Sequence, residues 1–364
     1  MKKKADETTV RMADVESDKA SALNALKSKE HRFMPKQTGL LVAAVLLFII
    51  SFAFGRYPIS PGNLLMILAS RFFPVAHTWP ANLDIVVWNV RLPRIFAAML
   101  VGAALSTSGA AFQGMFRNPL VSPDILGASM GAGFGAALGL YFSFDPLGIE
   151  LLAFSFGLFA VLLAYYISSR IRFDPMLVLV LCGVLVGTIF SALTSLIKLV
   201  ADPMSKLPAI TFFLMGSLAT VTPRDVFVVI IPMLLGGIPL FILRWRLNVL
   251  SLGDEEAMAL GLDTRKMRFI VIICSTLMTS AAVSISGLIG WVGLIVPHLA
   301  RMIVGPNFKM LLPTAIILGS AYLLLVDDMA RCLFSTEVPL GILTALIGAP
   351  FFLFLLLKGQ RGWK

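Results

Sequence analysis

The feature that most constrains this chain is a series of long runs without a charged residue. They cover 38–55, 95–116, 125–144, 151–169, 175–197, 226–243, 269–300, 310–326 and 338–357. A membrane-spanning helix needs ~20 predominantly apolar residues. The run 269–300 exceeds one span, and Gly287, Gly290 and Gly293 divide it, so it predicts two helices, the second of them short. The sequence therefore predicts an all-α polytopic membrane protein with about ten transmembrane helices.

Composition agrees with this prediction. Of the 364 residues 58% are hydrophobic and 14% charged, and the mean hydropathy is +0.90. A soluble domain of this size does not need so much apolar surface, so most of the chain has lipid as its solvent. The formal net charge of +10 lies in a charged N-terminal segment and in short loops. That distribution is typical of membrane-flanking charge and does not indicate nucleic-acid binding.

The positions of Lys and Arg predict the orientation. When the loops are assigned alternately to two sides, the side of the N-terminal segment collects 22 Lys and Arg and the other side 8. Positive loops are enriched in the cytoplasm. We therefore expect residues 1–37 to be a cytoplasmic tail, residues 38–360 to be a transmembrane domain in the cytoplasmic membrane, and both termini to be cytoplasmic.

The sequence lacks the residue patterns that metal binding, hydrolysis and ATP binding require. Cys182, Cys274 and Cys332 are far apart, as are the three histidines, so we expect no metal site. The G-x-S-x-G pattern at 127–131 falls in an apolar helix rather than in a strand–turn–helix elbow, which disfavours a hydrolase. There is no G-x-x-x-x-G-K-[ST] motif to hold ATP phosphates, so we expect neither catalytic residues nor a bound cofactor.

The uncharged runs also contain no carboxylate, which ion-coupled transporters usually place inside the membrane. A transporter of this kind needs energy from a separate ATPase. Two other classes stay open at this point, a secondary transporter and a membrane enzyme. Dependence on an ATPase would distinguish the first, and product formation without transport the second.

A polar island at 252–268 interrupts the apolar sequence on the side predicted to be cytoplasmic. Asp254, Glu255 and Glu256 begin a short helical pattern, where carboxylates favour the positive end of the helix dipole. Gly261 follows as an expected C-terminal stop. Residues 263–268 can begin a second short helix. An ordinary solvated loop is the alternative interpretation of this island.

Three arginines lie on the opposite side, Arg91 and Arg94 in R-L-P-R and Arg331 in D-D-M-A-R. Arg binds carboxylates through a fork of donors, so these residues could bind acidic side chains of a partner. The alternatives are anchoring at the membrane interface, or pairing of Arg331 with Asp327 or Asp328 one helical turn away.

Two patterns concern packing. The segment A-A-x-S-x-S-G occurs at 103–109 and again at 281–287, five predicted helices later, so the two copies should run in opposite directions as in an inverted repeat. Gly127, Gly131, Gly135 and Gly139 recur at every fourth position, and Gly183 and Gly187 do so elsewhere. Small residues on one stripe allow helices to approach closely in lipid.

Longer motifs occur in order along residues 90–357. They are R-L-P-R at 91–94, the small-residue segment 102–132, M-G-S-L at 215–218, the island with E-A-x-x-x-G at 256–261, S-G-L-I-G-W-V-G-L-I-V-P-H-L-A-R at 286–301, D-D-M-A-R at 327–331 and V-P-L-G-I-L-T-A-L-I-G-A-P-F-F at 338–352. Together they closely resemble the FecCD-like permeases of ABC importers for iron chelates, haem and cobalamin.

The resemblance implies a type II ABC importer permease fold and a second permease copy, most simply in a homodimer. It also implies two ABC ATPase subunits, which use ATP and Mg, and an extracytoplasmic substrate-binding protein. The positions that match the family's ATPase-coupling helix are Asp254, Glu255, Glu256, Ala257, Leu260 and Gly261. Those that match its docking residues for the binding protein are Arg91, Arg94 and Arg331. The paired acids Asp327 and Asp328 depart from the pattern and would weaken a positive pocket near Arg331.

For the substrate, the resemblance suggests a bulky metal chelate. An iron–siderophore complex is the first expectation, and haem or a corrinoid such as cobalamin comes next. The sequence names no substrate-selecting residue.

Overall fold

The computed structural model describes residues 35–55, 57–74, 76–171, 173–333 and 336–359, and in these ranges it is helical, without a strand. The N-terminal tail is thus described only from Pro35, where a helix begins that continues to Ser51. The remaining elements are α2 (Pro61–Ser70), α3 (Ala81–Ile85), the π-helical segment η1 (Val86–Arg91), α4 (Leu92–Met115), the 3-10 helix η2 (Pro123–Leu126), α5 (Ala128–Tyr141), α6 (Pro146–Arg170), α7 (Pro175–Val200), α8 (Lys206–Leu214), α9 (Pro223–Ile242), α10 (Arg244–Leu250), α11 (Asp254–Ala259), α12 (Thr264–Ser286), α13 (Val292–Val304), α14 (Phe308–Cys332) and α15 (Leu340–Gly359).

Every uncharged run contains a helix, which confirms the all-α prediction. The run 269–300 divides as expected, because α12 ends at Ser286 and the short α13 begins at Val292. Six described helices are long and apolar enough to cross a membrane by length and composition, and others, such as Pro35–Ser51 and α13, are shorter. The short helices α2, α3 and α8 were not predicted.

Local sequence explains where the long helices begin. Asp145 precedes Pro146 at the start of α6, and its carboxylate accepts a hydrogen bond from the Gly148 amide at 3.3 Å. Asp174 and Pro175 repeat the arrangement at α7, where the Met176 amide donates at 2.9 Å. The aspartate satisfies an amide that has no partner in the first turn, and proline lacks the amide that would be unpaired there.

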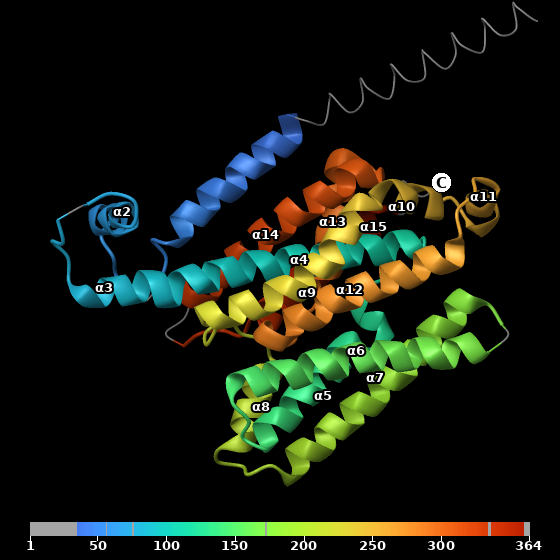
Figure 1. Ribbon diagram of the computed structural model, residues 1–364, viewed down its shortest axis with the longest axis horizontal. Helices are drawn as coiled ribbons and strands as arrows, with labels where there is room; N and C mark the ends of the chain where they lie inside the picture. Colours follow the sequence, from blue (N-terminus) through green and yellow to red (C-terminus); the bar gives the residue numbers. More distant parts are fainter. Residues whose placement is uncertain (1–34, 56, 75, 172, 334–335, 360–364) are drawn as a thin grey trace, which may run out of the picture.

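The helices form two neighbouring groups (Figure 1). In one, α4 lies at the centre and packs against α12, α13 and α14, with α9 on α12. In the other, α5, α6 and α7 pack on one another and join the first group through the contacts of α12 with α5 and α6. Helices α4 and α12 are largely buried, whereas most of the apolar surface of α6, α7 and α9 is exposed, as lipid-facing helices require.

Glycines set how closely several helices approach. A Cβ atom at Gly131 would lie 2.4 Å from the carbonyl oxygen of Phe156 in α6, and one at Gly135 2.3 Å from that of Leu152. Both distances are too short for any side chain, so the glycine stripe packs α5 on α6 as predicted. Gly127 is not inside the helix: it precedes α5 in a left-handed conformation and packs near Gly183 and Gly187 of α7.

The bundle has two polar ends, which we name by what they carry. The α11 end holds α11 and the first turn of α12, and the arginine end holds Arg91, Arg94 and Arg331. Helix α4 runs from the arginine end to the α11 end, where Arg117 approaches Gly253. Helix α12 runs back, with Arg268 paired to Asp254 near its start (Figure 1). The two copies of A-A-x-S-x-S-G therefore run in opposite directions, as the sequence predicted.

Candidate functional site

The α11 segment is a six-residue helix, Asp254–Ala259, with all three predicted acids in its first turn. Ala257 is fully buried and fixes one face of the helix against the bundle. The carboxylate of Asp254 forms an ion pair with the Arg268 guanidinium of α12. The segment is thus tied to the transmembrane helix that follows it.

Gly261 ends α11 as the sequence predicted. Its φ of 79° lies in the left-handed region, which glycine adopts without strain. In that conformation its amide donates to the Met258 carbonyl at 2.9 Å, and the Leu262 amide donates to the Ala257 carbonyl at 2.9 Å. These two bonds satisfy carbonyls at the helix end and turn the chain back toward α12.

One expectation for this region was wrong. Residues 264–268 do not form a separate short helix but are the first turns of α12, which continues to Ser286. No Gly or Pro interrupts that stretch, so the helix has no reason to stop. Asp263 is its N-cap, and the hydrogen bond donated by the Lys266 amide lowers the pKa of the Asp263 carboxyl below its usual value. The second short helix of this region is α10, which precedes α11.

The tip of the α11 segment exposes apolar side chains beside its acids. Leu252 and Met258 are each 57% exposed and Leu260 is 64% exposed, while Glu255 and Glu256 also face outward. A short helix that leaves its apolar side chains uncovered at a polar end suits insertion into a partner's cleft.

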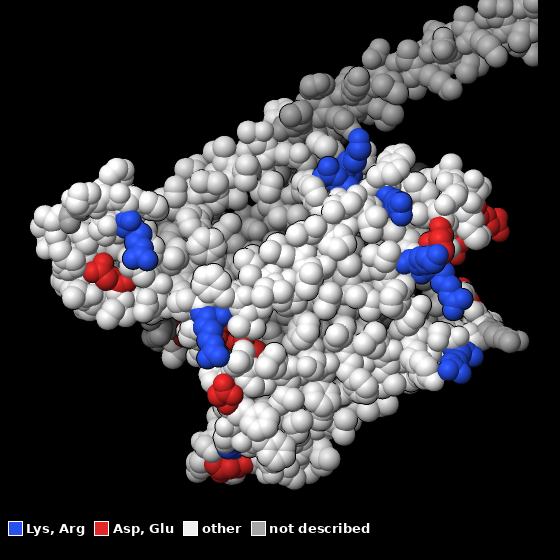
Figure 2. Space-filling model, in the orientation of Figure 1, with Lys and Arg blue, Asp and Glu red and all other residues white. Residues whose placement is uncertain are grey.

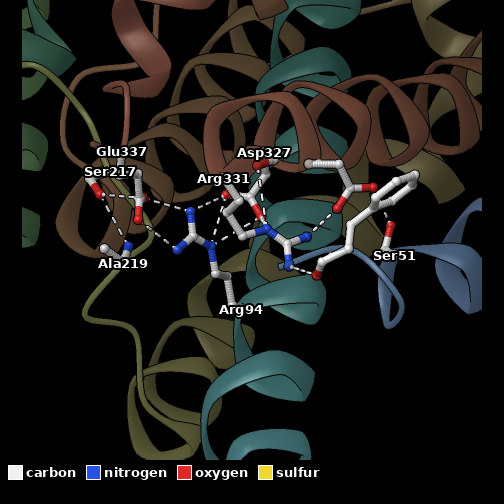
Figure 3. A network of polar contacts seen from close by, with 9 residues as sticks. Ser51, Arg94, Ser217, Ala219, Asp327, Arg331 and Glu337 are labelled. Atoms are coloured by element: carbon white, nitrogen blue, oxygen red, sulfur yellow. Dashed lines mark hydrogen bonds and ion pairs between the residues drawn. The ribbon is translucent and has the colours of Figure 1, made fainter. Parts of the chain in front are cut away.

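At the arginine end, Arg94 is 7% exposed and forms two ion pairs within the chain (Figure 3). Its guanidinium lies 2.7 Å from Asp327 Oδ1 and 2.6 Å from Glu337 Oε1. Each of the two carboxylates accepts hydrogen bonds from two nitrogens of the Arg94 guanidinium. This bidentate geometry is the one in which Arg binds carboxylates most strongly. Arg94 thus ties α4 to α14 and to the segment before α15.

Arg331 continues the network along α14. Its Nε lies 3.1 Å from Asp327 Oδ2, its Nη2 pairs with Asp328, and its Nη1 donates to the Phe54 carbonyl at 3.0 Å. Asp328 also accepts a hydrogen bond from the Ser51 hydroxyl at 2.5 Å (Figure 3). The pairing of Arg331 within one helical turn, which the sequence offered as an alternative to docking, is therefore present.

Arg91 contacts the backbone instead. It is 4% exposed, and its guanidinium donates to the carbonyls of Phe52 and Tyr57. The three arginines thus gather at one end, as expected, but each is buried and bonded to this chain. A partner carboxylate could reach them only if these contacts opened, and the docking role stays a prediction.

Sequence reasoning missed three members of this network, Glu337, Ser51 and Ser217. Glu337 lies 243 residues from Arg94, and Ser51 lies 277 residues from Asp328. Ser217 donates to Glu337 Oε1 at 3.4 Å (Figure 3). No local spacing connects such distant residues. Only the rule that buried charges are paired, applied to three arginines and two aspartates, could have suggested a further acid such as Glu337.

On the face shown in Figure 2, charged side chains gather toward the two ends, and the surface between them is almost free of charge. Beside Met215 and Trp291 lies an open, mostly apolar cleft of about 440 Å³. It is also lined by Leu214, Leu288, Gly290, Gly341, Ile342, Ala345 and Leu346. Among the described residues, no three His, Cys, Asp or Glu side chains gather in a way that could hold a metal ion.

The fold and its polar ends define a multi-pass helical membrane protein. Residues 42–358 match the FecCD transport family. The chain belongs to this family, whose members are permease subunits of ABC importers and not enzymes.

Relatives within the family differ in what they carry. The chain is 43% identical to a molybdate import system permease protein of Haemophilus influenzae, over 89% of this chain and 96% of that one. It is 41% identical to a probable iron chelatin transport system permease protein of Helicobacter pylori (76% and 84% covered) and 39% identical to a cobalamin import system permease protein of Halobacterium salinarum (78% and 76%). A solved structure described as an inward-facing conformation of a metal-chelate type ABC transporter superposes with a TM-score of 0.80 at 42% identity, covering 89% of this chain and 99% of that one.

Proposed function

We propose that this chain is the permease subunit of a binding-protein-dependent importer that moves a metal-containing solute, driven by a separate ATPase that uses ATP and Mg. The observation that carries the proposal is the α11 segment, a short helix with exposed acidic and apolar side chains that is tied to α12 by the Asp254–Arg268 pair. Movement of the ATPase would reach the transmembrane helices through this connection.

In this proposal Asp254, Glu255, Glu256, Ala257, Leu260 and Gly261 form the ATPase-coupling element, and the α11 end faces the cytoplasm. The excess of Lys and Arg on that side supports the orientation. The substrate-binding protein docks at the arginine end, where the buried arginines and carboxylates hold α4, α14 and the segment before α15 in place beneath the docking surface. A second copy of the chain completes the permease as a homodimer.

For the substrate we propose an iron–siderophore chelate, with haem or a corrinoid as the alternatives. Iron chelate and cobalamin permeases among the relatives support a chelate, as does the open apolar cleft beside Trp291, which suits a bulky solute. The second candidate is molybdate, because the chain is 43% identical to a molybdate permease over most of both chains.

Uptake into proteoliposomes tests the proposal. The permease is reconstituted with its ATPase and binding protein, and iron–siderophore, haem, cobalamin and molybdate are offered in turn, with ATP or a non-hydrolysable analogue inside. We expect ATP-dependent uptake of one solute. The double variant Glu256→Arg/Gly261→Arg should lose uptake, because it reverses a charge on α11 and places a long side chain where the backbone is left-handed.

The outcomes separate the parts of the proposal. Uptake without ATP, or uptake that survives the double variant while the ATPase stays bound, would refute coupling through α11. ATP-dependent uptake of molybdate alone would replace the chelate with the oxyanion and leave the coupling proposal in place.

A further inference from the structure

A second cleft lies at the α11 end, between the two exposed helices α6 and α7 and the start of α12. Its volume is about 400 Å³, and it is more enclosed than the apolar cleft beside Trp291. The lining residues are Tyr165, Ser168, Ser169, Ile171, Pro175, Met176, Leu179, Asp254, Thr264, Arg265, Arg268 and Ile272. The cleft shares Asp254 and Arg268 with the proposed coupling connection, but its remaining lining has no part in the coupling role of α11 or in the transport path.

The lining combines polar and apolar side chains. Arg265 and Ser169 are exposed and Leu179 and Ile272 are buried, although Ile171 is also exposed and Ser168 is also buried. A ligand with a polar headgroup and an apolar portion would contact both kinds of side chain. Most of the apolar surface of α6 and α7, two of the helices that form the cleft, is exposed, as it would be beside lipid.

The charges of the lining favour an anion. The lining contains two guanidinium groups, those of Arg265 and Arg268, and one carboxylate, that of Asp254. The carboxylate already pairs with Arg268. Arg265 is exposed, and no ion pair or hydrogen bond to its side chain is found in the part of the chain described. The Nε atom of Arg268 is buried without a hydrogen-bond partner. A buried donor without a partner costs free energy, so the Arg268 guanidinium is not fully compensated by Asp254.

Phosphate matches these donors. Arg binds phosphate oxygens through several N–H groups at once, and the hydroxyls of Ser169 and Thr264 can donate as well. Within the described ranges Arg265 has no such ion pair, so it can bind a phosphate oxygen without breaking the Asp254–Arg268 pair. Basic pockets between transmembrane helices at the cytoplasmic side are typical sites for anionic lipid headgroups.

We propose that this cleft binds the headgroup of an anionic phospholipid, with the start of its acyl chains against Leu179 and Ile272. The lipid would contact α6, α7 and α12 together and would lie beside the ion pair that holds α11. The lipid site goes beyond the importer function and does not depend on which solute is carried, but it rests on the proposed cytoplasmic orientation of the α11 end.

Photo-crosslinking tests the proposal on the assembled transporter in nanodiscs. The probe is a phosphatidylglycerol with a diazirine near the headgroup end of one acyl chain, and phosphatidylcholine with the same label is the comparison. We expect crosslinks on peptides of residues 165–179 and 264–272, with phosphatidylglycerol strongly preferred. Competition with unlabelled lipids gives the relative affinity of the two headgroups.

Two neighbouring residues provide a matched pair of variants. Arg265→Gln should lower the preference for phosphatidylglycerol about fivefold, which corresponds to ~1 kcal/mol for one basic residue at an anionic lipid. Lys266→Gln removes the same charge one position away, from a side chain that is exposed, pairs with Asp263 and does not line the cleft. We expect it to keep the preference.

Three results would overturn the proposal. Equal crosslinking of the two lipids would show that the cleft does not recognise charge. An equal loss in Arg265→Gln and Lys266→Gln would assign the preference to the surface potential alone. Displacement of the probe by soluble glycerol 3-phosphate at concentrations similar to those of the lipid would show that the ligand is a free phosphate ester.

Discussion

At the scale of single residues, the arginine end shows how the chain tolerates charge inside long apolar helices. Helices α4 and α14 extend beyond the uncharged runs 95–116 and 310–326, and the added turns contain Arg94, Asp327 and Arg331. Each charge is buried beside an opposite charge, so none is left without compensation. Such a network restricts how α4 and α14 can move relative to each other.

Asp327 is the residue whose replacement tests this network most directly. It is fully buried and faces both Arg94 and Arg331. Asp327→Asn keeps the shape but leaves two guanidinium groups without their shared carboxylate, which should lower the free energy of unfolding by about 3–5 kcal/mol. Denaturant unfolding in mixed micelles measures the loss.

Two further variants control for this experiment. Glu255→Gln is also a carboxylate-to-amide change, but on an exposed side chain, and should stay within about 0.5 kcal/mol of the wild type. The double variant Arg94→Met/Asp327→Leu should be less destabilised than Asp327→Asn, because it removes a positive and a negative charge together. If Asp327→Asn unfolds like the wild type, the network does not stabilise the fold.

The sequence predicted part of this site. The spacing of Arg331 from Asp327 and Asp328, within one helical turn, was enough to suggest their pairing. The partners of Arg94 come from α14 and from Glu337, more than 230 residues away, and only folding brings them together. For the same reason the burial of Arg91 could not be predicted, since its acceptors are backbone carbonyls.

At the scale of helices, close contacts through glycine hold the central group together. A Cβ atom at Gly109 of α4 would lie 1.9 Å from the Gly293 carbonyl oxygen of α13. Gly109→Ala would force the two helices apart and should cost about 1–3 kcal/mol. At Gly290, which precedes α13, an added Cβ atom meets nothing within 4 Å, so Gly290→Ala is the matched control and should be nearly neutral.

In a Cys332→Ser background, which removes the exposed thiol, a thiol-reactive dye that fluoresces on reaction can follow unfolding of both variants, because Cys182 and Cys274 are buried until the bundle opens. We expect a lower thermal midpoint for Gly109→Ala and an unchanged one for Gly290→Ala. Equal midpoints for the two variants would show that α4 and α13 can separate at no cost.

Elements with a strong periodic or compositional pattern were predictable, and the others were not. Long uncharged runs located the spanning helices, and glycine spacing predicted the contact of α5 with α6. Helices α2, α3 and α8 have five to ten residues and no comparable pattern, because contacts with the rest of the molecule determine them. The polar sequence 263–268 suggests a separate short helix, whereas residues 264–268 are the first turns of α12, because a change in polarity does not by itself end a helix.

At the scale of the whole molecule, the face shown in Figure 2 has charge at both ends and an almost uncharged surface between them, which fits a protein that crosses the membrane. This charge distribution does not determine which end of the molecule faces the cytoplasm. The proposed orientation rests on the asymmetry of Lys and Arg, and it determines which end meets the ATPase and which end meets the binding protein. A native cysteine makes the direction measurable.

Cys332 ends α14 at the arginine end and is exposed, whereas Cys182 and Cys274 are buried. A membrane-impermeant maleimide should therefore label wild-type protein in intact spheroplasts without binding protein, and Cys332→Ser should abolish the signal. In the Cys332→Ser background, Glu255→Cys places a thiol on the exposed face of α11. This thiol should react only in inside-out vesicles, because the α11 end faces the cytoplasm. Labelling of Glu255→Cys in spheroplasts, with Cys332 reactive only in inside-out vesicles, would reverse the orientation and place α11 beyond the reach of a cytoplasmic ATPase.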